Sequence, residues 1–169
     1  MDLTSDNPLD QKMSDEDKLF QERMNKIEAE HTAIMATMKN LGDKFKSPRH
    51  VGEGMWDFYN YRLFLIDLKK NWRKVASAGA TERKTLMDDM VKSIKHGTHV
   101  GSFKGDISLM PKNDKDREIV YNAAMSDIDY KNEFISAHLE FILDQISSVD
   151  KMIFGFESII KFYDKYVNT

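Results

Sequence analysis

The feature that most constrains the fold is a series of ten apolar residues near the C-terminus, spaced alternately by four and three. This alternation places all ten residues on one stripe of an α-helix, as in helices that pack along a coiled-coil seam. The series therefore predicts a long C-terminal helix that buries one stripe against partner helices. Its members are Ile135, Leu139, Ile142, Ile146, Val149, Ile153, Phe156, Ile160, Tyr163 and Val167.

The length of this helix bears on the shape of the molecule. At 1.5 Å per residue, a helix over 129–167 would be roughly 58 Å long. A compact sphere of this chain length would be only about 40 Å across. The unbroken spacing favours an elongated molecule, and a weaker possibility is a break in the polar stretch 126–133.

Further helices are predicted in the N-terminal half. Ser14 is placed to cap a first helix that ends at Gly42, and a second helix covers 55–78, closed by Gly79. Thr81 is placed to cap a short third helix. The second helix carries two apolar stripes, which is typical of a central helix in a bundle. These stripes are Phe58, Tyr61, Leu65, Leu68, Trp72 and Val75 on one face, and Trp56, Tyr59, Leu63 and Ile66 on another.

These patterns predict an all-α fold, an elongated bundle of four to five helices with a long, heptad-patterned C-terminal helix. Residues 1–13 are acidic and polar and are expected to form a disordered tail. Residues 14–169 are expected to form a single helical-bundle domain. The chain has 169 residues, of which 41% are apolar and 31% charged, and only three are proline, as a well-packed helical protein requires.

The composition excludes several chemistries. The absence of cysteine excludes disulfides, cysteine-ligated metal centres and thiol nucleophiles. A formal net charge of −3 gives no general reason to bind nucleic acid, so no nucleic-acid partner is expected. The longest aliphatic or aromatic run, 63–66, is far too short for a transmembrane segment. The N-terminus lacks the apolar core of a Sec signal, so a soluble cytoplasmic protein is expected, with non-Sec export left open.

No set of residues converges on a catalytic or metal site. His96 and His99 lack further ligands, and the glycines near them lack the lysine and hydroxyl of a phosphate-binding loop. Glu28 and His31 form one Glu-x-x-His motif, whereas a di-iron bundle needs two. No catalytic, cofactor-binding or metal-ligating residue is therefore assigned, and no cofactor is expected. The basic and apolar residues of two long connections become candidates for partner docking: His96, His99, Phe103, Lys104 and Ile107, and Lys46, Arg49 and His50.

Because most of the patterned residues form helix seams, the sequence favours a non-enzymatic protein–protein interaction module. An adaptor, a chaperone-like factor or a subunit of a larger assembly would fit, including a bacterial or phage factor associated with secretion. Protein partners are expected, and a homodimer through the C-terminal helix is one of them. Two alternatives stay open: a metal-binding or enzymatic bundle with a site near 92–108, and an elongated lipid-binding helical module.

Overall fold

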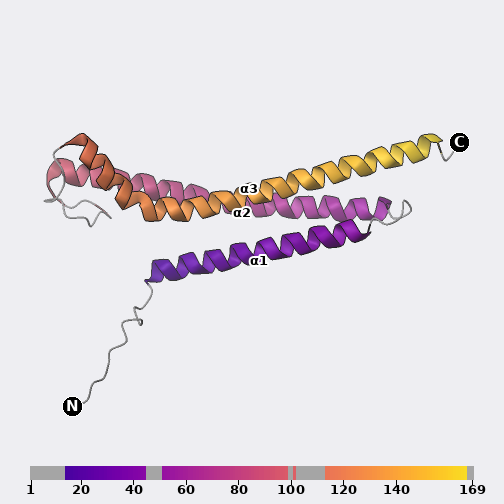
Figure 1. Cartoon of the computed structure of the whole chain (residues 1–169), viewed down its shortest axis with the longest axis horizontal. Helices are drawn as coiled ribbons and strands as arrows, with labels where there is room; N and C mark the ends of the chain where they lie inside the picture. The colour runs from indigo at the N-terminus through magenta and orange to yellow at the C-terminus, as the bar shows by residue number, and fades with distance from the viewer. Residues whose placement is uncertain (1–13, 45–50, 99–100, 102–112, 167–169) are drawn as a thin grey trace, which may run out of the picture. The chain divides into compact units, whose positions relative to one another are not determined.

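The computed structural model describes residues 14–44, 51–98, 101 and 113–166, and these residues form three α-helices without a strand (Figure 1). The helices are α1 (Asp15–Lys44), α2 (Val51–His96) and α3 (Asp114–Tyr166). The predicted all-α class is confirmed, but the described ranges hold three helices where four to five were predicted. The wider elongated bundle and its heptad packing stay predictions.

The chain divides into two compact units, Met1–Lys44 and Phe45–Thr169. The first unit contains α1, and the second contains α2 and α3. The predicted single domain over 14–169 stays a prediction. The predicted tail, residues 1–13, lies outside the described residues.

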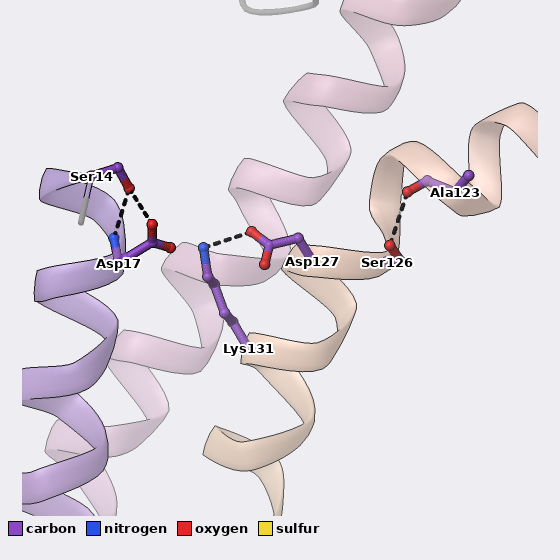
Figure 2. A network of polar contacts seen from close by, with 6 residues as sticks. All are labelled: Ser14, Asp17, Ala123, Ser126, Asp127 and Lys131. Carbon is purple, nitrogen blue, oxygen red and sulfur yellow. Dashed lines mark hydrogen bonds and ion pairs between the residues drawn. The ribbon is translucent and has the colours of Figure 1, made fainter. Parts of the chain in front are cut away.

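The N-terminus of α1 is capped as the sequence predicts. The Ser14 hydroxyl accepts a hydrogen bond from the Asp17 backbone amide at 3.1 Å and donates one to the Asp17 carboxylate at 2.7 Å (Figure 2). Asp15, Glu16 and Asp17 fill the first turn, where negative charge interacts favourably with the helix dipole. Gly42 does not end the helix, which continues to Lys44.

The predicted division of residues 55–95 into two helices is wrong, because α2 runs without interruption from Val51 to His96. Gly79 lies inside the helix, and the Thr81 hydroxyl donates to the Ser77 carbonyl one turn earlier at 2.8 Å instead of capping a new helix. A glycine inside a helix costs only about 1 kcal/mol relative to alanine, which packing of a long helix readily offsets. The helix ends instead at His96, and the next residue, Gly97, has a φ of 65°, the left-handed conformation that terminates helices.

Gly79 also permits a close approach between α2 and α3. A Cβ atom at this position would lie 2.1 Å from the Asn132 side-chain oxygen and 3.1 Å from its Cγ. The hydrogen of glycine leaves room for the Asn132 amide group. The same residue that locally weakens α2 therefore lets the two helices meet at this point.

Helix α3 spans 53 residues, or about 80 Å at the usual rise per residue. It begins at Asp114 and is capped by the preceding residue, Asn113, whose side-chain oxygen accepts a hydrogen bond from the Lys115 amide at 2.9 Å. The predicted break at 126–133 does not occur as an interruption, although the first part of α3 runs at an angle to the rest (Figure 1). Polar groups there bond locally: Ser126 donates to the Ala123 carbonyl at 2.9 Å, and Lys131 pairs with Asp127 at 2.6 Å (Figure 2).

Helices α2 and α3 pack as an antiparallel hairpin. Phe58 contacts Phe156 with ring centroids 5.4 Å apart, and Trp72 contacts His138 edge to face at 4.7 Å. Nearer the connection, Met90 packs with Met125. In these pairs the residue number rises along α2 while it falls along α3. The two helices therefore keep one antiparallel register along the hairpin.

The hairpin buries half of the stripe predicted for the C-terminal helix. Five of its ten members are buried, namely Ile135, Ile142, Ile146, Val149 and Ile153. Leu139, Phe156 and Ile160 are half-buried, Tyr163 is exposed, and Val167 lies outside the described residues. The burial of this stripe therefore weakens toward the C-terminus.

Candidate functional site

The structure places only one of the predicted docking residues. His96 is the last residue of α2, and its side chain is exposed. The others fall outside the described ranges, so the structure neither brings the set together nor separates it: His99, Phe103, Lys104, Ile107, Lys46, Arg49 and His50.

The chain turns back toward α2 soon after that helix ends. Gly101 has a φ of 61°, and a Cβ atom there would lie 2.0 to 2.8 Å from the three carboxyl atoms of Asp89. Any larger residue would have to displace the Asp89 carboxylate. Gly101 therefore lies directly against α2, two turns before the end of that helix.

The part of the chain that the structure describes contains neither a cluster of metal-ligating side chains nor a membrane-spanning helix. No three histidine, aspartate or glutamate side chains there gather closely enough to hold a metal ion. None of the three helices, over their described residues, has an apolar stretch suited to crossing a bilayer.

The most distinctive surface lies where the start of α2 meets the end of α3. This part of the hairpin, residues 56–64 of α2 and 152–166 of α3, is called the aromatic end below. Trp56 is 70% exposed, Leu63 59% and Phe154 71%. Trp56 and Leu63 lie seven residues apart and so share one face of α2, and exposed large apolar side chains that share a face commonly mark interaction sites. The remaining exposed members are Tyr59, Phe64, Met152, Ile159, Phe162, Tyr163 and Tyr166.

Two polar contacts between α2 and α3 fix the geometry of the aromatic end. The Tyr59 hydroxyl donates to the Glu157 carboxylate at 3.0 Å, and the Arg62 guanidinium pairs with Asp150. The hydrogen bond to Glu157 is the main cause that raises the pKa of Tyr59, and the bond to Asp150 raises the pKa of Arg62. These contacts hold the two helices in register while the apolar side chains beside them face solvent.

A similar pair holds the hairpin nearer its connection. Arg83 on α2 donates two hydrogen bonds, from two guanidinium nitrogens, to the two carboxylate oxygens of Asp129 on α3. This bidentate arrangement lowers the pKa of the Asp129 carboxyl. Both side chains are about half exposed, so the pair adds more to register than to stability.

Beneath the exposed residues, Tyr61 is buried with its ring stacked on Phe64 at 6.0 Å between centroids. Burial raises the pKa of the Tyr61 phenol from 10.0 to about 12. Because the folded-state pKa is raised, the stability that the neutral phenol contributes is fully present below pH 10. It is lost as the pH rises from 10 toward 12.

We therefore expect Tyr61→Phe to be less sensitive to alkali than the unmodified protein. The free energy of unfolding of the unmodified protein should fall by about 1 kcal/mol more than that of Tyr61→Phe as the pH rises through this window, after allowance for solvent screening. Urea unfolding at several pH values measures the difference. Equal losses in the two proteins would show that Tyr61 ionises as freely in the folded chain as in the unfolded one.

The sequence pointed to the aromatic end but assigned it another role. The spacing of Trp56, Tyr59, Leu63 and Ile66 predicts a second buried face on a central helix. In the structure Ile66 is half-buried, whereas Trp56, Tyr59 and Leu63 are exposed. The sequence signal for this surface is the second apolar stripe on α2. The first stripe of that helix is enough to pack against α3, so the second can remain exposed.

Comparison of the chain with protein-family models, curated proteins and solved structures finds no match in any of the three. The function is therefore argued from the arrangement of residues in this chain.

Proposed function

We propose that the protein is a non-enzymatic interaction module that binds protein partners through the aromatic end of the α2–α3 hairpin. The observation that carries this proposal is the exposure of large apolar side chains on both helices, above all Trp56, Leu63 and Phe154. Tryptophan and other aromatic residues supply much of the binding energy in protein interfaces, because they bury a large area at a small entropic cost. An adaptor, a chaperone-like factor or an assembly subunit would use such a surface.

The local geometry also favours a preformed surface. The Tyr59–Glu157 contact lies within this region and the Arg62–Asp150 contact lies beside it, and both join α2 to α3. Buried Phe58 and half-buried Phe156 pack against each other and so join the two helices. A partner would therefore meet side chains carried by paired helices, which lowers the ordering cost of binding.

Quantitative affinity capture from the native cell lysate, with mass spectrometry, tests this function. The full chain should retain specific proteins, and the double variant Trp56→Ser/Leu63→Ser should lose at least about nine-tenths of them, as expected for interface anchors. The matched control is Val91→Ser/Ile119→Ser, which removes exposed apolar side chains near the opposite end of the hairpin. Circular dichroism establishes that all three proteins are folded.

Two outcomes would count against the proposal. Retention of no protein above the level of an unrelated bait would remove the evidence for partners. Equal retention by the Trp56→Ser/Leu63→Ser variant would place binding elsewhere on the chain.

A further inference from the structure

The last turns of α3 carry a second apolar stripe beside the one that faces α2, and Tyr163 belongs to both. Met152, Ile159, Tyr163 and Tyr166 are separated by seven, four and three residues, which places them on one face of the helix. Their exposed fractions run from 36% to 60%, and Phe162, 59% exposed, lies beside them. The ring of Phe162 packs on that of Tyr166 at 4.9 Å. These five residues are called the outer stripe.

The outer stripe lies beside the surface that α3 uses within the hairpin, and apart from Tyr163 its members do not belong to the stripe that faces α2. Val149 and Ile153 are buried in the hairpin core, and Ile160 is half-buried. Phe154 is 71% exposed but lies five residues before Ile159, which is about 140° around the helix. The outer stripe therefore leaves α3 able to contact another helix without giving up α2.

The composition of the outer stripe favours a partner of the same kind. All five side chains are apolar or aromatic, and none carries a charge. Spacings of seven, four and three residues also fit the heptad repeat with which two helices pack along a coiled-coil seam. In a dimer with two-fold symmetry, the same surface of both copies forms the interface. A second copy would therefore present the same uncharged stripe to the first.

The exposed area is sufficient for such a pair. Aromatic and large aliphatic side chains bury about 150–250 Å² each when fully covered, so these partly exposed residues offer on the order of 500 Å² per copy. Two copies together would bury roughly 1,000 Å², which is the lower bound for a specific interface. The expected association is therefore reversible and dependent on concentration.

We propose that the outer stripe, within residues 152–166, is a homodimer contact that packs against the same stripe of a second copy of this chain. This inference rests on the proposed interaction function and names one of its partners. It concerns α3 alone, whereas the capture experiment above alters α2. Each proposal therefore has its own variants.

Sedimentation velocity of the full chain tests the contact over concentrations from about 1 µM to about 1 mM, which brackets the affinity expected for an interface of this size. The mass should rise with concentration from 19.7 kDa toward twice that value. Ile159→Glu should weaken the association by at least about 100-fold, since it places a charge in the middle of the stripe. Leu143→Glu is the matched control, because Leu143 is 41% exposed on α3 and lies outside the aromatic end, and this variant should associate like the unmodified protein.

A second measurement does not depend on the stability of the glutamate variant. The chain contains no cysteine, so Phe162→Cys introduces a single site for a nitroxide spin label. Dipolar coupling between labels on two copies is expected at high concentration and should disappear on dilution with unlabelled protein.

A 19.7 kDa monomer at every concentration would overturn the inference, as would a dimer that Ile159→Glu leaves intact. Failure of this inference can be told apart from failure of the proposed function. A monomer that still captures partners through Trp56 and Leu63 would refute only the homodimer. A dimer that captures nothing would refute only the binding of other proteins by the α2 surface.

Discussion

Ile142→Asp is expected to abolish cooperative folding of the α2–α3 hairpin. Ile142 is fully buried in the stripe that α3 turns toward α2. An ionised carboxylate at this position would lose its hydration, and the cost of leaving it unpaired is several kcal/mol. Natural domains are stable by only about 5–15 kcal/mol, so the change should remove most or all of the stability. Thermal and urea unfolding, followed by far-ultraviolet circular dichroism, measure the effect.

The neighbouring residue provides a matched control. Leu143 is 41% exposed, so Leu143→Asp introduces the same charge and nearly the same helix propensity on the solvent side. The Leu143 variant should unfold cooperatively, with a midpoint close to that of the unmodified protein. If both variants behaved alike, the stripe containing Ile142 would not be the surface that joins the two helices.

Phe58→Ala should produce the second-largest effect, through loss of packing rather than through charge. The Phe58 side chain is fully buried and contacts the ring of Phe156. Its truncation removes apolar burial and leaves a cavity, at a cost of about 3–5 kcal/mol. For a chain of this length such a loss lowers the melting temperature by about 10 °C.

Trp56→Ala tests whether the burial of the side chain, and not the size of its ring, determines the loss of stability. Trp56 lies two residues earlier on α2, is larger than Phe58 and is 70% exposed. Its truncation should change the free energy of unfolding by less than about 0.5 kcal/mol. Destabilisation comparable to that of Phe58→Ala would mean that Trp56 is covered within the folded chain, which would weaken the case for a binding surface there.

The buried stripe of α3 was predictable because helical periodicity alone decides which residues share a face. Ile135, Ile142 and Val149 are all buried as the spacing indicated. The continuity of α2 past Gly79 was harder to predict, since the local cost of this glycine is small and the residue that lies against it, Asn132, is far away in the sequence. Local sequence patterns do not show which distant residue will lie against a given glycine.

The candidate site was only partly predictable for a related reason. The apolar stripe containing Trp56 and Leu63 is visible in the sequence, but periodicity does not show whether another element covers it. The Arg62–Asp150 and Arg83–Asp129 pairs join residues 88 and 46 positions apart. Such pairs follow from the register of the two helices, and that register becomes known only once the hairpin is seen.

The single register of the hairpin also implies an order in which its parts form and open. Arg83 and Asp129 close a loop of 46 positions, whereas Tyr59 and Glu157 close one of 98. Since longer loops cost more entropy to close, pairing should begin near the Met90–Met125 contact and proceed toward the aromatic end. Amide hydrogens should accordingly exchange fastest where α2 begins and α3 ends. The region proposed to bind partners is thus the first to fray, and binding there would slow the opening of the entire hairpin.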